Sequence, residues 1–400
     1  MRCPQGERGP RWSLDPCTRH LNHGSFGAVP VAVQEEQERL RRLMEWNPVR
    51  WFATLAERIA DARAELAQLL AVERESLALV PNVSAGVSVV YASLLGAGPV
   101  DVVVTDHGYG AVTMGAERLA RRTGGRCRVV PIPLEASASQ VVELLEPALA
   151  QRPHLLVIDQ VTSPTARALP AAEVCAMARG YGVRTLVDGA HAPGVLDDPV
   201  CREADYWVGN LHKFACAPRG TAVLVARDGG QELYPLIDSW GAREPFPHRF
   251  DHQGTIDATA WLCAPFAWRH IEETIGWAAL RQEASRVLDE GSAVVAEALA
   301  AVVADPVPDV GQPVGLMRLL RLPAPLARDR ETADALRVPF SREAGVAVSF
   351  TSFHGEGYLR LSAHAYNQHA DFVHLANAGV PLLCRWAREQ AQEEVSRVEE

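Results

Sequence analysis

Lys213 is the one side chain in this sequence whose amine can react with a carbonyl compound. The chain contains 39 lysine and arginine residues, and Lys213 is its single lysine. Arginine serves wherever only positive charge is needed, but a guanidinium is not deprotonated in proteins and does not condense with an aldehyde. A drift of composition toward arginine could leave one lysine by chance, so the neighbours of Lys213 decide the interpretation.

Those neighbours favour amine chemistry. The apolar run 206–208 predicts a strand that ends just before Asn210, His212 and Lys213, and Asp188 ends an earlier apolar run. A lysine can bond covalently to an aldehyde, and a nearby carboxylate keeps a pyridine nitrogen protonated. Pyridoxal 5'-phosphate (PLP) needs both partners, together with a phosphate site and a group that stacks on its ring.

The phosphate site has a candidate in the segment 77–91, where an apolar strand is followed by a polar turn and a helix start. The free N–H groups of a helix start at Asn82 or Ser84 would suit a phosphate, although a simple helix cap explains the same residues. Ser84 and His212 are the candidates for the phosphate, and Tyr109 is the candidate for the stacking group.

Strands and helices alternate along the first two thirds of the chain. Helical spacing is predicted for 31–43, 51–70 and 171–179, with a break at Asn47-Pro48, and a helix is also predicted up to Arg122. Buried-type strands are predicted at 100–105, 128–131, 154–159, 184–188 and 219–226. This alternation is typical of a largely parallel sheet covered by helices, in which ligands bind at the carboxyl ends of the strands. Tyr109, Ser163, Asp188 and Lys213 all lie at or just after such ends.

A long helical tract, 261–303, is predicted to lead into a smaller second domain. There, strands are expected at 314–322, 346–350 and 358–364, and helices at 371–394. We therefore expect an N-terminal arm (1–20), a large cofactor-binding domain (21–265) and a small α+β domain (266–400).

Composition limits the partners. A net charge of −10 argues against a nucleic-acid footprint and against binding to an anionic membrane. No run is long and apolar enough for a membrane helix, and residues 1–19 lack the apolar core of a signal peptide. The eight cysteines have no metal-ligand spacing, so we expect no metal site and a soluble protein of the reducing cytoplasm that acts on a small molecule.

Three motifs together resemble the class V aminotransferase family of PLP enzymes, over about residues 20–380. They are Val187-Asp188-Gly-Ala-His191, Asn210-Leu-His212-Lys213, and the segment from Arg360 to Asn367. The segment 22–27 and Gln253-Gly254-Thr255 are most similar to the isopenicillin N epimerase-like branch, which includes cysteine S-conjugate enzymes of lincosamide pathways. The resemblance implies the PLP-dependent transferase fold (fold type I), an α/β fold with a mostly parallel sheet in the large domain.

The resemblance also implies roles for individual residues. Lys213 would bind the cofactor covalently, Asp188 would face the ring nitrogen, and Arg360 would hold the substrate carboxylate. Further contacts to the cofactor would come from Val83, Ser84, Tyr109, Ser163, His191, Asn210, His212 and, across a homodimer interface, Thr255. Arg360 could instead be a surface arginine, and the side-chain pocket could include His23, Ser25, Phe26, Trp51 and Phe353.

Two departures from the desulfurase-type members matter. Asn210 stands where those members carry a serine, which puts its phosphate contact in question. No cysteine lies between Cys263 and Cys384, where desulfurases place their nucleophile. Persulfide chemistry is therefore not expected.

The expected reaction begins at Cα of an amino acid. We expect a β-eliminating C–S lyase that acts on an S-substituted cysteine in antibiotic or secondary metabolism. The alternatives are an amino-acid epimerase, a decarboxylating oxidative deaminase of a cysteine S-conjugate, and a non-catalytic binding protein with this fold. Inversion at Cα usually needs a second base, for which Tyr109 and His23 are the candidates, whereas elimination needs only one.

Overall fold

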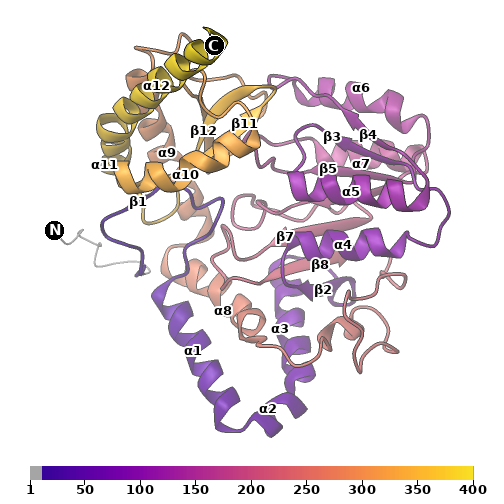
Figure 1. The fold of residues 1–400 in the computed structure, drawn as a ribbon. Helices are drawn as coiled ribbons and strands as arrows, with labels where there is room; N and C mark the ends of the chain where they lie inside the picture. Colours follow the sequence, from indigo (N-terminus) through magenta and orange to yellow (C-terminus); the bar gives the residue numbers. More distant parts are fainter. Residues whose placement is uncertain (1–10, 400) are drawn as a thin grey trace.

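A seven-stranded sheet with helices on both faces forms the larger part of the computed structural model, which describes residues 11–399 (Figure 1). The strand order is β2-β8-β7-β6-β5-β3-β4, and β8 is antiparallel to both of its neighbours while the other pairs are parallel. The predicted mostly parallel sheet is therefore confirmed. Its strands are β2 (Leu77–Val80), β3 (Val102–Thr105), β4 (Cys127–Val130), β5 (Leu155–Asp159), β6 (Arg184–Asp188), β7 (Tyr206–Asn210) and β8 (Ala222–Ala226).

Alternate residues of these strands bury their side chains against different helix layers. Leu155 and Val157 of β5 belong to the apolar cluster of α4 (Val83–Ser93) and α5 (Gly110–Thr123). Leu156 and Ile158 belong to the cluster on the opposite face. That face is covered by α3 (Leu55–Leu69), α6 (Ala138–Leu149), α7 (Ala171–Gly180) and α8 (Thr259–Thr274). Since successive strand side chains point to opposite faces, the continuous apolar runs of the sequence suit a sheet buried on both sides.

One helix break was predicted correctly from the sequence and another was not. The expected break at Asn47 is present between α1 (Val31–Trp46) and α2 (Pro48–Ala53), where the Asn47 side chain accepts the N–H of Arg50. The single tract expected over 261–303 is wrong, because α8 ends at Thr274 and α9 (Trp277–Leu299) begins after Gly276, whose φ is 84°. Helices α6 and α10 (Arg330–Ala344) were not predicted.

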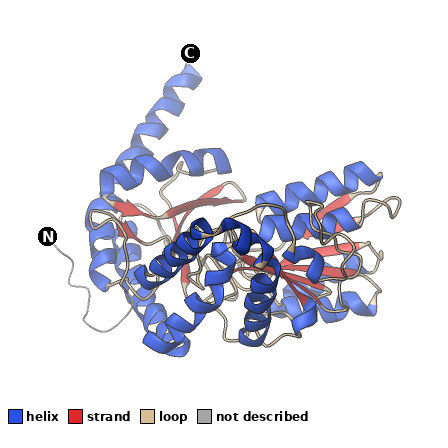
Figure 2. Ribbon diagram, turned by 90° about the horizontal axis from the view of Figure 1, so that it is seen from below, coloured by secondary structure: helices blue, strands red, loops and turns tan. Residues whose placement is uncertain are grey.

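A three-stranded antiparallel sheet in the order β11-β12-β9 forms the core of the smaller part, which Figure 2 shows beside the large sheet. Its elements are β9 (Met317–Arg321), β10 (Val346–Ala347), β11 (Ser349–Phe353), β12 (Glu356–Ser362), α11 (His369–His374), a π-helical turn (Leu375–Gly379) and α12 (Val380–Glu399). Helix α9 packs against this part so closely that a Cβ on Gly291 would lie 2.2 Å from the Phe372 ring. The domain ranges given above stay a prediction.

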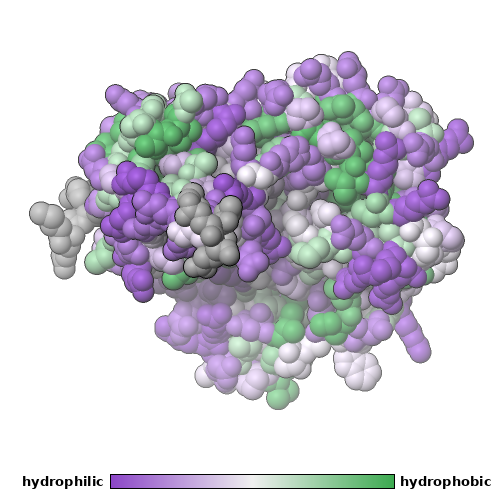
Figure 3. All heavy atoms as spheres, turned by 45° about the horizontal axis from the view of Figure 1, so that its top comes forward, coloured by the Kyte–Doolittle hydropathy of each residue, from purple (hydrophilic) through white to green (hydrophobic). Residues whose placement is uncertain are grey.

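The described beginning of the chain packs onto this smaller part. Strand β1 (Arg19–His20) pairs in parallel with β10, and the Asn22 amide donates to the Val348 carbonyl. Residues 1–10 of the expected arm lie outside the described residues. Within residues 11–399, no helix combines the length and apolar character that crossing a membrane requires. The face drawn in Figure 3 carries many hydrophilic side chains with hydrophobic patches between them.

Candidate active site

The ends of three neighbouring strands bring the candidate residues to one edge of the large sheet. Asp159, Asp188 and Asn210 end β5, β6 and β7, and Asp159 is the register partner of Asp188. Lys213 follows β7 directly in a loop. Since the carboxyl ends of parallel strands share one edge, residues far apart in sequence meet there.

Lys213 lies beside a buried histidine. Its Nζ is 3.0 Å from His191 Nε2, and burial, followed by the charge of Arg360, lowers the pKa of the lysine to about 8. His191 Nε2 also lies 3.0 Å from the Gly24 carbonyl oxygen. Burial and the Lys213 charge hold the pKa of His191 well below its usual value, so the imidazole is neutral at pH 7.

One carboxylate oxygen of Asp188 has no hydrogen-bond partner. The residue is 2% exposed, its Oδ1 accepts the Ala190 N–H at 2.9 Å, and its Oδ2 is buried without a hydrogen-bond partner. Burial raises the pKa of this carboxyl. A buried unsatisfied carboxylate oxygen costs free energy. A protonated pyridine nitrogen would satisfy it, so the residues present fit PLP.

Asp159 is a second buried carboxyl at this edge, and it was not predicted from the sequence. It is 3% exposed, and burial, followed by the charge of Asp188, raises its pKa well above the usual value. The carboxyl also accepts the backbone N–H of Tyr109. Two adjacent buried carboxyls do not both ionise readily, and we expect Asp159 to be the one that keeps its proton. It ends an apolar strand as Asp188 does, which is the signal that could have revealed it.

Arg360 on β12 reaches the same edge from the smaller part. It is 3% exposed; its Nη1 donates to the Ser163 carbonyl at 2.6 Å and its Nη2 donates to Ser25 Oγ at 2.6 Å. The buried Nε has no partner, and burial lowers the pKa of the guanidinium to about 10. A planar fork held this way can bind a carboxylate through two parallel bonds. The structure thus brings Ser25, Ser163 and Arg360 together.

The start of α4 differs from the expected phosphate site. Asn82 caps the helix by accepting the Ala85 N–H at 2.9 Å, and Asn210 Oδ1 accepts the Val83 N–H at 3.1 Å. The Val83 N–H, expected to bind phosphate, therefore already has a partner. Ser84 is exposed in the first turn of the helix. His212 Nδ1 lies 2.9 Å from the Thr221 carbonyl oxygen, and burial lowers the pKa of this ring to about 4.

His23 was predicted to take part in substrate binding. It is fully buried, with Nδ1 2.9 Å from the Tyr366 hydroxyl and Nε2 3.1 Å from the Lys213 carbonyl oxygen. Both ring nitrogens therefore have partners within the protein, and the expected role of His23 in substrate binding stays a prediction. Tyr109 is 44% exposed just before α5, and Thr255 is exposed in the loop before α8.

The remaining expected pocket residues are spread over different environments. Trp51 is 2% exposed in α2, Phe353 is 6% exposed at the end of β11, and Phe26 is 64% exposed in the loop after β1. They could not be placed from sequence, because burial depends on neighbours from distant segments.

Comparison with known proteins places this geometry in context. Residues 31–293 match the family model described as aminotransferase class V. The chain is 31% identical over 388 residues to isopenicillin N epimerase of Streptomyces clavuligerus, a match that covers 92% of this chain and 96% of that protein. It is 26% identical over 431 residues to the L-cysteine desulfhydrase-like protein lolT1 of Epichloe uncinata, covering 93% and 94%.

Solved structures share the fold. The apo cysteine desulfurase of Thermococcus onnurineus NA1 superposes with a TM-score of 0.77 at 17% identity, covering 96% of this chain and 98% of that one. A mutant of C-DES with glycine covalently linked to its PLP cofactor superposes with a TM-score of 0.74 at 19% identity, covering 90% and 95%.

Proposed function

This chain belongs to the aminotransferase class V family, and we propose that it is a PLP-dependent lyase that cleaves the C–S bond of an S-substituted cysteine. Its cofactor is pyridoxal 5'-phosphate, as in the family's relatives. When bound, PLP supplies an electron sink that stabilises negative charge at Cα of an amino acid.

The residues that would hold the cofactor are those at the sheet edge. Lys213 would bind its aldehyde and Asp188 its ring nitrogen, which the unpaired Oδ2 supports. Tyr109 would cover the ring, Ser163 and His191 would face its oxygen, and Ser84 and His212 would contact the phosphate. Asn210 would act indirectly, because its side-chain oxygen holds the start of α4 through Val83.

Arg360 and Lys213 would divide the work on the substrate. Arg360 would bind the α-carboxylate with help from Ser25, which fixes the orientation of the Cα–H bond. The Lys213 amine, whose pKa is lowered to about 8, would take the Cα proton as the thiolate leaves Cβ, and would then pass a proton to that thiolate. Overall, one substrate and one water give a thiol, pyruvate and ammonia.

The engagement of both ring nitrogens of His23, a candidate second base, is the observation that carries this proposal. Elimination needs one base and a leaving group at Cβ, whereas inversion of Cα usually needs a base on each face. Among the described residues, His23 was a candidate for the second base, and both of its ring nitrogens are already engaged. Relatives described as cysteine desulfhydrase-like support the same choice.

Product analysis tests the proposal. An S-substituted L-cysteine incubated with the enzyme should release a free thiol together with equimolar pyruvate and ammonia. The opposite enantiomer should not accumulate. Carbon dioxide and an aldehyde formed with oxygen consumption would instead establish the decarboxylating reaction.

Amino-acid epimerisation is the second candidate, favoured by the 31% identity to isopenicillin N epimerase across 96% of that protein. Tyr109, 44% exposed, would then serve as the second base. In heavy water, the substrate would return racemised and deuterated at Cα, with no thiol and no keto acid. That outcome would replace the lyase proposal.

We also propose a homodimer in which Thr255 reaches the phosphate of the partner subunit. Thr255 lies in an exposed loop, and the preceding loop exposes several large apolar side chains. They are Tyr234 (51%), Leu236 (55%), Ile237 (56%) and Trp240 (97%). Exposed apolar groups of this kind commonly mark an interface. The free cysteines among the described residues suit the reducing cytoplasm. We also propose a role in antibiotic or secondary-metabolite biosynthesis, which the similarity to isopenicillin N epimerase supports.

A further inference from the structure

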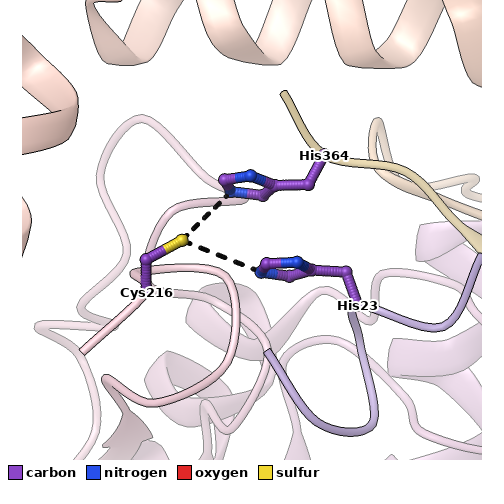
Figure 4. Close-up of side chains that lie close together, drawn as sticks. All are labelled: His23, Cys216 and His364. Atoms are coloured by element: carbon purple, nitrogen blue, oxygen red, sulfur yellow. Dashed lines mark hydrogen bonds between the residues drawn. The ribbon is translucent and has the colours of Figure 1, made fainter. Parts of the chain in front are cut away.

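Three buried side chains lie close together: His23, Cys216 and His364 (Figure 4). Cys216 Sγ lies 3.9 Å from His23 Nε2 and 3.5 Å from His364 Nε2. Their exposures are 0%, 0% and 1%. They come from the loop after β1, the Lys213 loop and the segment after β12, so the cluster joins parts of the chain that each carry a site residue.

The distances alone would suit a metal ion, but the orientation of the rings does not. The two imidazoles are stacked, with centroids 4.0 Å apart and planes within 8° of parallel. The lone pair of a ring nitrogen lies in the plane of its ring, and a bound zinc sits about 2.0 Å away along it. Lone pairs in two parallel, separated planes do not meet at one ion.

The Nε2 atom of each ring has another partner, which is a main-chain carbonyl. His23 Nε2 lies 3.1 Å from the Lys213 carbonyl oxygen, and His364 Nε2 lies 3.2 Å from that of Phe214. The Cys216 N–H also donates to the Lys213 carbonyl at 3.1 Å. The two histidines therefore donate to consecutive peptide groups, the first of which belongs to the reactive lysine.

These assignments require neutral rings, and the surroundings supply them. Burial holds the pKa of His23 well below its usual value and lowers that of His364 to about 4, while it raises that of the Cys216 thiol. With Nε2 carrying its proton, His23 Nδ1 can accept the Tyr366 hydroxyl at 2.9 Å. Each donor of the cluster then faces the Lys213 loop.

We propose that His23 and His364 are positioning residues that fix the backbone of Lys213 and hold it at a set distance from Arg360. His364 follows Arg360 on the same segment, so a bond from His364 to the Phe214 carbonyl ties the carboxylate clamp to the lysine loop. This inference rests on the proposed function, in which Lys213 and Arg360 act on one substrate. Misplacing a reacting group by about 1 Å can cost on the order of a hundredfold in rate.

Glutamine and asparagine separate positioning from simple packing. The amide nitrogen of glutamine can take the place of Nε2 and donate to the same carbonyl. The asparagine side chain is one methylene shorter, so its amide nitrogen does not reach that carbonyl. We expect His364→Gln to keep kcat within a few-fold and His364→Asn to lower kcat by about tenfold or more. His23→Gln and His23→Asn should behave in the same way. Equal kcat in the glutamine and asparagine variants would overturn the proposal.

A second readout does not depend on turnover. Because Lys213 is the single lysine, amine labelling of the PLP-free full chain, read by mass spectrometry across pH, reports the pKa of its free amine. The asparagine variants should shift this pKa, and the glutamine variants should not. His107→Asn is the control, since His107 is equally buried but bonds Thr165 and the Ile132 carbonyl. An unshifted pKa in the asparagine variants would refute positioning even if the protein proved not to be a lyase.

Metal analysis tests the alternative that His23, Cys216 and His364 bind a metal ion. Elemental analysis of the purified protein should find no zinc or copper in a stoichiometric molar ratio to the protein chain. Stoichiometric metal that is lost in Cys216→Ser, but kept in the buried control Cys175→Ser, would replace the hydrogen-bonded cluster with a metal site and overturn the proposal.

Discussion

The two buried carboxyls at the ends of β5 and β6 are neighbours in register but differ in what they face. Asp188 has an oxygen without a partner, whereas Asp159 accepts the N–H of Tyr109 and has its pKa raised well above the usual value. A charged Asp188 beside a protonated Asp159 is the arrangement that leaves one negative charge for a pyridine nitrogen.

Amide substitutions should reveal this difference. Asp188→Asn should lower kcat by about a hundredfold or more, because an amide does not keep the ring nitrogen protonated. Asp159→Asn should stay within a few-fold, because an amide resembles the protonated carboxyl that it replaces. Steady-state kinetics measures kcat of both variants, each loaded with PLP. A similar loss of kcat in the two variants would contradict a charged Asp188 beside a protonated Asp159.

Arg360→Lys should weaken the carboxylate site without disturbing the cofactor. A point charge replaces a two-pronged donor, so we expect KM for an amino-acid substrate to rise by about tenfold or more. The visible absorbance of the bound cofactor should not change. Arg318→Lys serves as a control, since Arg318 lies on β9 and donates to Asp289. Unchanged KM in Arg360→Lys would make Arg360 a structural residue.

At the scale of elements, the sequence predicted most of the sheet because each strand is a short apolar run bounded by turns. Leu155 to Asp159 and Arg184 to Asp188 were located almost to the residue. Strand 346–350 was drawn as one element, but the chain divides it: β10 pairs with β1, and β11 pairs with β12. That division depends on partners from opposite ends of the chain, which local pattern does not contain.

The same reasoning applies to the candidate site. Lys213, Asp188 and Arg360 were found because their types are unusual where they stand. The partners of His23, Tyr366 and the Lys213 carbonyl, could not be predicted, because they are set by the fold and not by the local motif. Asp159 was missed because one acidic residue at a strand end looks ordinary until its neighbour is known.

The packing of α9 against α11 gives a prediction about stability. Gly291→Ala should destabilise the protein by about 1–3 kcal/mol, because the new Cβ would meet the Phe372 ring at 2.2 Å. Gly180→Ala is the matched control, since Gly180 is also helical and has no atom within 4 Å of the added Cβ. Because alanine has a higher helix propensity than glycine, the free energy of unfolding of Gly180→Ala should equal or slightly exceed that of the parent. Chemical denaturation compares the two; equal stability would contradict the close contact.

At the scale of the whole molecule, buried histidines should make the fold sensitive to acid. Burial lowers the pKa of His107, His212 and His364 to about 4, from an ordinary value of 6.5. As pH falls from 6.5 toward 4, the unfolded chain binds protons that the folded chain does not, so the free energy of unfolding decreases. The raised pKa of Asp159 and Asp188 opposes this only in part. The melting temperature should fall across that window; a constant value would refute the neutral assignment.

The proposed dimer can be tested on the whole molecule as well. Sedimentation should show a species of two chains, and Trp240→Glu should shift it toward monomer because a charge would enter the buried interface. Trp46→Glu is a control at another exposed tryptophan, 79% exposed in α1. A monomer that still binds PLP and turns over substrate would rule out a shared phosphate site.

The pairing of β1 with β10 has a consequence for how the protein is made. The loop from Asn22 to Gly27 is synthesised early, yet the carbonyl that Asn22 bonds lies 326 residues later. At about 5–20 residues per second, the ribosome needs on the order of tens of seconds to reach it. The segment that carries His23 and Ser25 must therefore wait, unpaired, while the large sheet folds, and the site closes only when the last part of the chain has emerged.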